Sequence, residues 1–177
     1  MQIEIATFGG GCFWCIEAII QRLKGVEKIV SGYTGGTVPG VPTYREVCSG
    51  LTGHAEVVQV TFDSDILSYH ALIAVFMTSH DPTQLNKQGA DRGTQYRSVI
   101  YYHSNQQKEV AGNVFSEIKN YYSEPIVTEL SEAKEFHIAD KEHQDYYNEN
   151  FGNGYCSIVI DPKITRLRTM YSDMLKA

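Results

Sequence analysis

The sequence lacks a long apolar run and any excess of basic residues. Its longest unbroken apolar stretch, residues 71–77, is far shorter than the roughly 20 residues that a membrane-spanning helix needs. The 177 residues include 15 Lys and Arg against 21 Asp and Glu, a net charge of −6 that argues against nucleic acid as a partner. The first residues, MQIEIATF, alternate like a strand and show no basic segment followed by an apolar one, as a secretory signal would. We therefore expect a cytoplasmic protein with neither membrane nor nucleic acid as a partner.

Motifs typical of metal and nucleotide sites are also missing. None of the six histidines stands in an HExxH motif, and the one CxxC has no second pair that would complete a zinc site. The phosphate-binding pattern GxxxxGK[ST] and the dinucleotide fingerprint GxGxxG are absent too. We expect neither a metal nor a cofactor. Because thiols stay reduced in the cytoplasm, the four cysteines suggest core residues or redox chemistry rather than disulfide staples.

What the chain does contain is a series of alternating strand and helix patterns, without repeats or linkers, which predicts one domain over residues 1–177. Strands are expected at 3–8, 26–33, 55–62 and 99–103, with a short one near Ile126. Helices are expected just after 9–11, after a Ser68 cap, over 106–122 and over 144–150. Residues 34–43 and 81–95 should be loops, and beyond Cys156 only a brief apolar alternation is visible. The mixture predicts an α/β (α+β) two-layer sandwich.

Cys12 follows the predicted first strand and three glycines, at the start of the first predicted helix. Unsatisfied amides and the positive end of the helix dipole favour a thiolate at such a position, and the thiolate is the nucleophilic form. Phe13 and Trp14 add large apolar surfaces beside it. The alternative is that Cys12 and Cys15 are merely small buried residues of a helix start.

Glu56 has the same strand parity as Val58, Val60 and Phe62, so alternation directs its carboxyl toward the core. Burial without a cation raises a carboxyl pKa, and a carboxylic acid that is still protonated near neutral pH suits a general acid. Its place at the beginning of the strand equally allows a side chain that reaches solvent.

Cys156 lies in a glycine-rich segment that we expect to be mobile, so its thiol could reach an oxidised Cys12 and form a disulfide. An inert cysteine late in the chain fits the same pattern. Cys48 has no activating neighbour in the sequence, and we interpret it as structural.

Seven short motifs occur in a fixed order along most of the chain: GCFW at 11–14, PTYREVCSG at 42–50, TGHAE at 52–56, HDPT at 80–83, NKQGAD at 86–91, GTQYRS at 93–98 and GYC at 154–156. In sequence and order they resemble the A-type peptide methionine sulfoxide reductases. The resemblance implies a ferredoxin-like plait with a mixed sheet. It also implies thiol-dependent reduction of methionine S-sulfoxide, free or in proteins, consistent with one enzyme for each sulfoxide epimer.

Residue by residue, the resemblance implies that Cys12 is the nucleophile and that Glu56 protonates the sulfoxide oxygen. It implies that Phe13 and Trp14 form the walls of the pocket for the S-methyl group. Cys156 corresponds to a cysteine that resolves the sulfenic acid on Cys12 as an intramolecular disulfide, which a thioredoxin-type partner then reduces.

Three further residues take roles from the same resemblance. Tyr44 and Tyr96 correspond to phenols that hold the sulfoxide oxygen, and Asp91 to a carboxylate of the active-site loops. The chain departs from many members of the family at Cys15, where they have glycine, so a Cys12–Cys15 pairing is also conceivable. It also lacks the additional C-terminal cysteine of some members, since no cysteine follows Cys156.

Two other functions remain as alternatives. A general dithiol–disulfide oxidoreductase could use Cys12 and Cys15 as its redox pair. A binding module without catalysis could use Phe13, Trp14 and nearby tyrosines to hold a peptide.

Overall fold

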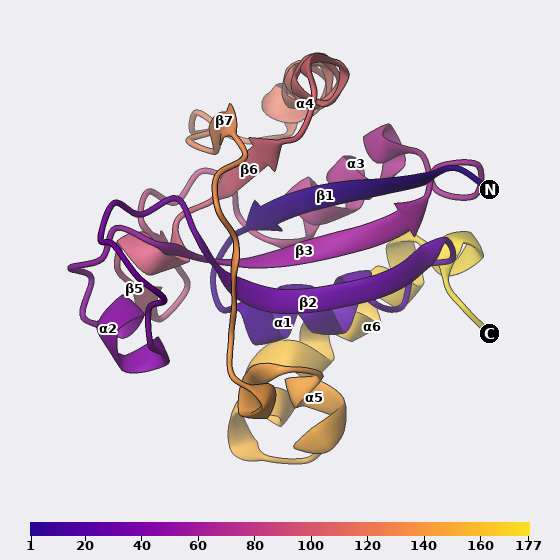
Figure 1. Ribbon diagram of the computed structural model, residues 1–177. Helices are drawn as coiled ribbons and strands as arrows, with labels where there is room; N and C mark the ends of the chain where they lie inside the picture. The colour runs from indigo at the N-terminus through magenta and orange to yellow at the C-terminus, as the bar shows by residue number, and fades with distance from the viewer.

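A computed structural model describes all residues 1–177, and its centre is one mixed sheet of six strands (Figure 1). The strands are β1 (Ile3–Gly9), β2 (Val26–Thr34), β3 (Ala55–Asp63), β6 (Val99–Tyr102), β7 (Glu129–Glu132) and β8 (His137–Ile138). They lie in the order β7-β6-β1-β3-β2-β8. Only β6 and β7 are parallel, and the other neighbours are antiparallel.

The central order β6-β1-β3-β2, with α1 (Phe13–Ile20) between β1 and β2 and α3 (Tyr69–Ser79) between β3 and β6, is a ferredoxin-like plait. The predicted fold class is therefore confirmed. β7 and β8 extend the plait by one strand at each edge. β2 pairs with residues 55–62 of β3 and β1 with residues 58–63, so β3 lies between two paired strands.

The helices α1, α3 and α6 (Asp161–Met170) cover one face of the sheet, while α4 (Asn105–Ile118) lies along the edge near β6 and contacts α3 (Figure 1). Ser68 caps α3 as expected, since its hydroxyl accepts a hydrogen bond from the Ala71 amide at 3.1 Å. A cluster of 33 buried apolar residues joins the sheet to these helices. It draws on elements from both ends of the chain. No helix is long and apolar enough to cross a membrane.

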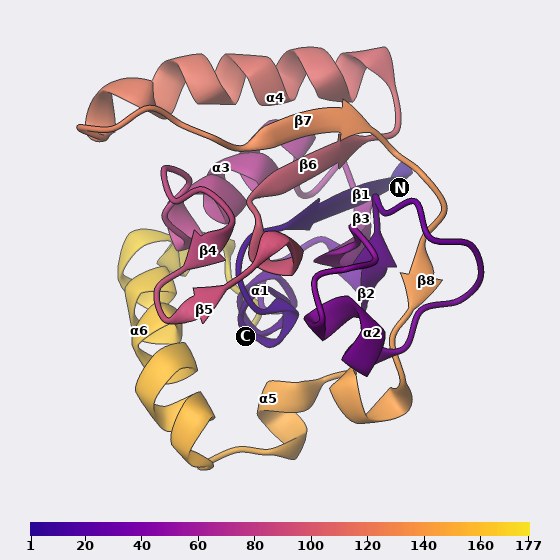
Figure 2. The same cartoon turned by 90° about the vertical axis from the view of Figure 1, so that its left-hand side faces the viewer.

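Shorter elements gather at the end of the sheet where α1 begins, which Figure 2 shows end-on. They are α2 (Tyr44–Cys48), the hairpin of β4 (Lys87–Gln88) and β5 (Asp91–Arg92), the 3-10 turn η1 (Thr94–Tyr96) and α5 (Tyr146–Glu149). Three more 3-10 turns are η2 (Lys119–Tyr121), η3 (Lys141–His143) and η5 (Ser172–Met174), and η4 (Cys156–Ile160) is a π-helical turn. The end of the sheet where α1 begins is therefore built from loops and short turns around the amino end of that helix.

Two expectations for the C-terminal third are wrong. The last predicted strand is displaced from Ile126 to β7, and the chain after Cys156 forms η4 and α6 rather than a brief alternation. Ile160, Ile164 and Leu167 recur at i, i+4 and i+7 and are all buried, so the helical period was present in the sequence. The preceding segment 156–160, apolar apart from Ser157, masked this period.

Candidate active site

Cys12 is the N-cap of α1, held there by the glycines that end β1. A Cβ on Gly9 would lie 2.2 Å from the carbonyl oxygen of Glu56, so only glycine lets β1 approach β3 this closely. Gly11 adopts a φ of +80°, and its amide donates to the carbonyl of Tyr96 at 3.0 Å. The turn fixes the start of α1 with the Cys12 side chain 8% exposed.

Glu56, on β3, lies directly beside this helix start. Its Oε1 accepts a hydrogen bond from the Phe13 amide at 3.1 Å, and its side chain is 1% exposed. Burial raises the pKa of the carboxyl to about 8, although the hydrogen bond from Phe13 acts in the opposite direction. The carboxyl is therefore mostly protonated at neutral pH. Its Oε2 has no hydrogen-bond partner in the protein and is free to donate a proton to a bound molecule.

Three tyrosines lie near this carboxyl. Burial raises the pKa of Tyr44 and Tyr96, and the nearby Glu56 raises both further. Tyr33, which sequence reasoning missed, pairs with Glu56 across β2 and β3 and is 1% exposed. Burial also raises its pKa, and its hydroxyl has no partner. Phenols with raised pKa stay protonated and keep a hydrogen to donate, which Tyr44 directs to the Cys48 sulfur here.

A wall of stacked rings closes the site on the side of α5. Trp14 stacks on Tyr146 with ring centroids 3.6 Å apart and an interplanar angle of 6°. The Trp14 indole donates to Nδ1 of His143 at 3.3 Å, and the His143 ring lies 4.3 Å from that of Tyr44. Phe13, fully buried, lies 5.7 Å from the His143 ring. Aromatic surface therefore dominates this side, as an apolar methyl group would require.

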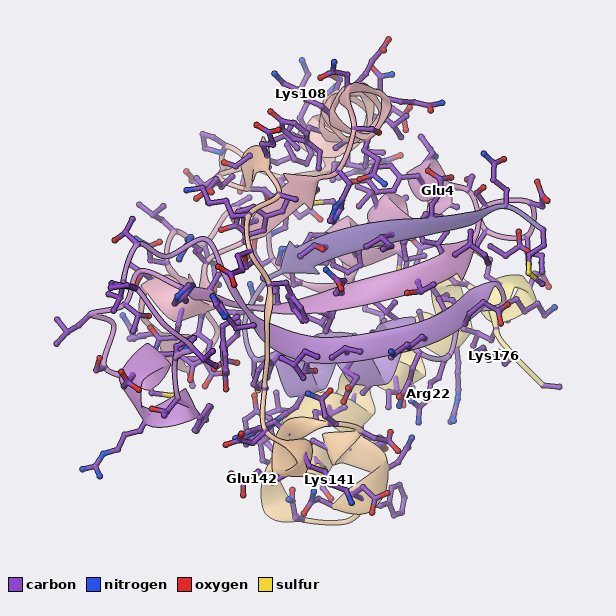
Figure 3. The ribbon with its side chains drawn as sticks, in the orientation of Figure 1. Glu4, Arg22, Lys108, Lys141, Glu142 and Lys176 are labelled. Atoms are coloured by element: carbon purple, nitrogen blue, oxygen red, sulfur yellow. The ribbon has the colours of Figure 1, made fainter.

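An open groove of about 1050 Å³ lies on the outer side of this wall. It is lined by Trp14 and Tyr44 together with residues of η3 and α5. Figure 3 shows two of its lining residues, Lys141 and Glu142, at the end of the molecule where α5 lies. The groove borders the rings rather than Cys12 itself. Access to the Cys12 sulfur from the groove therefore leads past the aromatic rings.

Glu17, buried on α1, anchors the segment that carries the wall. One of its oxygens accepts from the Tyr146 amide at 3.2 Å, and the other accepts from the Ser31 hydroxyl at 3.2 Å. Burial raises the pKa of this carboxyl, and the hydrogen bonds counteract the shift. Glu17 thus ties α5 to α1, a function that helical spacing alone did not reveal.

Asp91 lies at the side of the site where the Cys15 thiol lies. Its Oδ2 accepts from the Tyr155 hydroxyl at 3.1 Å, and that hydroxyl is 3.6 Å from the Cys15 sulfur. The charge of Asp91 also contributes to the raised pKa of Glu56. The structure brings the Asp91 carboxylate into the site through Tyr155, a residue that sequence reasoning did not single out.

The thiols differ from one another in their surroundings. Burial raises the pKa of Cys12, against the expectation that the helix amino end favours its thiolate, because the desolvation of the enclosed sulfur is the larger effect. A hydrogen bond from Cys12 lowers the pKa of Cys15 to about 7. Cys156 is fully buried at the start of η4, so the expected mobile loop is instead an ordered helical turn. All four cysteines are free, and no group of three or more metal-ligating side chains is present.

The residues that sequence reasoning missed share a cause. Tyr33 faces Glu56 only because β2 and β3 pair in one particular register. His143, Tyr146 and Tyr155 reach the site from irregular C-terminal segments, where neither periodicity nor spacing carries a signal. Among 12 tyrosines, no pattern in the sequence distinguishes these from the rest.

Comparison with known proteins covers nearly the whole chain. The family model described as "Peptide methionine sulfoxide reductase" matches residues 4–175. The chain belongs to this family. Peptide methionine sulfoxide reductase MsrA of Deinococcus radiodurans is 50% identical over 175 residues, which cover 98% of this chain and 84% of that protein. The protein of the same name from Saccharolobus solfataricus is 47% identical over 174 residues, 98% of each chain.

Solved structures agree with the family assignment. The crystal structure of Mxr1 from Saccharomyces cerevisiae in reduced form matches with a TM-score of 0.81 and 30% identity, over 86% of this chain and 88% of that one. Methionine sulfoxide reductase A of Corynebacterium diphtheriae matches with a TM-score of 0.79 and 36% identity, over 84% of this chain and 75% of that one. The plait and its loops are therefore those of the methionine sulfoxide reductase family.

Proposed function

We propose that this protein reduces methionine S-sulfoxide, free or within proteins, to methionine, with Cys12 as the nucleophile, and so repairs oxidised proteins. Membership of the family supports the reaction. The observation that carries the residue roles is the placement of a mostly protonated Glu56 carboxyl against the amide of the residue that follows Cys12. A nucleophile and an acid at one helix start are what the reaction requires.

In the first step, the Cys12 sulfur attacks the sulfoxide sulfur while Glu56 protonates the oxygen. Charge builds on that oxygen as the S–S contact forms, so the neutral carboxyl and the Tyr44 and Tyr96 hydroxyls stabilise the transition state. Proton transfer of this kind contributes about 10²–10⁴-fold to a rate. Methionine leaves, and the oxygen remains on Cys12 as a sulfenic acid.

Phe13 and Trp14 select the substrate by burying its S-methyl group. Each Å² of apolar surface removed from water contributes about 25 cal/mol to the binding free energy. A methyl group between two rings is therefore bound favourably without any charged contact. Because Cys12 is only 8% exposed, we expect the rings around it to separate when the substrate enters.

Regeneration returns Cys12 to the thiol through an intramolecular disulfide that includes Cys156, which a reduced thioredoxin-type dithiol then cleaves. The cycle needs no metal or organic cofactor, because sulfur carries the electrons at every step. Since it consumes a reduced dithiol partner, we propose that the protein acts in the cytoplasm, where such partners are kept reduced.

The test is a single turnover with racemic methionine sulfoxide and no added reductant. The wild-type protein should form at least one methionine per chain and consume only the S epimer, and Cys12→Ser should form none. Formation of methionine by Cys12→Ser would contradict the assignment of Cys12 as the nucleophile. Consumption of both epimers would contradict the assignment of the S-sulfoxide as the substrate.

A general dithiol oxidoreductase is the second candidate, favoured by the turn that places Cys12 and Cys15 together and by the Cys15 pKa of about 7. It predicts reduction of insulin disulfides that is lost equally in Cys12→Ser and Cys15→Ser. It also predicts no effect of Glu56→Gln, since disulfide exchange needs no acid at that position. Loss of activity in Glu56→Gln therefore separates the two functions.

A further inference from the structure

Cys12 and Cys15 stand at the two ends of one turn at the start of α1. The Cys15 amide donates to the Cys12 carbonyl at 3.1 Å, which closes a four-residue turn. Turns of this kind hold their outer Cα atoms within about 7 Å. Disulfides span about 4.4–6.8 Å between Cα atoms. The two thiols also shift each other's pKa, so the turn and this mutual effect both indicate that the two sulfurs can join without unfolding of the helix.

The surroundings of Cys15 favour a nucleophilic sulfur. Its sulfur lies 3.6 Å from the Tyr155 hydroxyl, and the positive charge of Lys163 acts on it. Ile16 and Phe76 pack around the same spot, where an enclosed space of only about 10 Å³ remains. Cys15 is thus a dry, hydrogen-bonded thiol within reach of Cys12.

Cys156 occupies a different position. It is fully buried at the start of η4, and its amide is held by the side chain of Asn153 at 2.8 Å. Burial raises the pKa of this thiol, and the charges that raise it further are those of Asp161 and Cys15. η4, which begins at Cys156, packs against α1, the helix that carries Cys15, and the charge of Cys15 acts on Cys12 as well as on Cys156. Cys15 is therefore placed to interact with both other thiols.

We infer that Cys15 is the first resolving cysteine: its sulfur attacks the sulfenic acid on Cys12, and Cys156 receives the oxidation only from Cys15. The inference rests on the function proposed above, which supplies the sulfenic acid. In the first step a Cys12–Cys15 bond forms, the S–O bond of Cys12 breaks, and the hydroxyl leaves as water with the thiol proton of Cys15. No further oxidant or reductant is needed.

In the second step the Cys156 sulfur, as thiolate, attacks Cys15. A Cys15–Cys156 bond forms, the Cys12–Cys15 bond breaks, and Cys12 leaves as a thiolate that is ready for the next substrate. The oxidation thus moves from the enclosed sulfur of Cys12 to the C-terminal segment without opening the aromatic wall. The reductant then meets a disulfide that no longer includes the nucleophile.

The experiment is one turnover with one equivalent of methionine S-sulfoxide per chain and no reductant, followed by acid quench, alkylation of free thiols and mass-spectrometric mapping of disulfides. Cys156→Ser should form the Cys12–Cys15 disulfide at the wild-type rate. The wild-type protein should yield a disulfide that contains Cys15. In Cys15→Ser the sulfenic acid on Cys12 should persist at least about tenfold longer, measured by trapping with dimedone.

The inference is overturned if Cys15→Ser forms a Cys12–Cys156 disulfide as fast as the wild type does. It is also overturned if Cys156→Ser retains the sulfenic acid with no disulfide. Ser79→Ala, which changes the wall of the same small cavity without removing a thiol, should behave as the wild type. Cys15→Ala serves if the serine disturbs the fold. The yield of methionine is measured in the same samples. If the wild type forms methionine but no disulfide that contains Cys15, this inference alone is wrong. If the wild type forms no methionine, the proposed function is wrong.

Discussion

Glu56 and Phe62 lie on the same strand, point to the same face and are almost equally buried, at 1% and 0% exposed. Around Phe62 that face meets the apolar core and makes stacked contact with Tyr69. Around Glu56 it meets the start of α1, a helix amide and three phenols. Burial at one end of β3 stabilises the fold, whereas at the other it changes the protonation of an acid. The comparison teaches that the core of a plait becomes a reactive site where its covering helix begins.

The largest effect is expected at the nucleophile. Cys12→Ser should reduce sulfoxide reduction to background, because a serine hydroxyl cannot form the sulfur–sulfur contact, while the fold persists since the two side chains are similar in size. Methionine release in a single turnover measures the activity, and circular dichroism the fold. Substantial remaining activity would place the chemistry elsewhere.

Glu56→Gln should lower kcat/KM by about 10²–10⁴-fold at neutral pH, because the amide retains the hydrogen bond but donates no acidic proton. Since the folded pKa is raised to about 8, the acid form is lost as pH rises through that value, and wild-type activity should fall above it. The variant should lack this decline. The rate of single turnovers measured across pH reports the loss of rate and the decline above about pH 8. Equal profiles for the wild type and Glu56→Gln would contradict the role of Glu56 as the acid.

Phe62→Ala should act on stability instead. Removal of a fully buried phenyl ring costs about 3–5 kcal/mol of unfolding free energy, because a cavity remains in the core. The rate per folded molecule should be unchanged, since Phe62 lies at the far end of the strand from Glu56. Denaturant unfolding and single-turnover rates provide the two numbers. A large loss of rate in the folded fraction would show that the two ends of β3 are not independent.

The smallest effect is expected from Tyr33→Phe. Its unpartnered hydroxyl faces the same site as Glu56, so loss of that donor should reduce the single-turnover rate by about 2- to 10-fold. The ring remains, so stability should hardly change. Tyr69→Phe is the matched control, because the Tyr69 hydroxyl is also buried and unpartnered but lies beside Phe62. Equal effects of the two variants would mean that Tyr33 acts only by packing.

The central strands could be predicted because alternation and turn residues agree with the final sheet, as β1, β2 and β3 show. Strand parity directed Glu56 toward the core but equally allowed a side chain that reaches solvent, and the structure shows it buried. The position of Cys12 at a helix start was visible from the glycines that precede it. The sheet order was not readable, since pairing depends on contacts distant in sequence. α6 was missed because an apolar run obscured its helical period.

The rest of the site depended on tertiary contacts. Tyr33 required the register of β2 and β3, and His143 and Tyr155 required the path of the C-terminal segment around α1. The raised pKa of Cys12 could not be predicted either, because helix-end electrostatics favour its thiolate and only the structure shows how completely the sulfur is enclosed. Local pattern indicates which residues are buried, and only the packing tells what they are buried against.

The most direct measurement of the central claim is the ionisation of the Glu56 carboxyl itself. Infrared difference spectra of Cys12→Ser across pH, with Glu56→Gln to identify the band, report the protonated carboxyl without turnover. A band that persists at pH 7 and disappears around pH 8 is the result predicted from its burial beside the start of α1. Complete ionisation by pH 6 would contradict a neutral acid at this position.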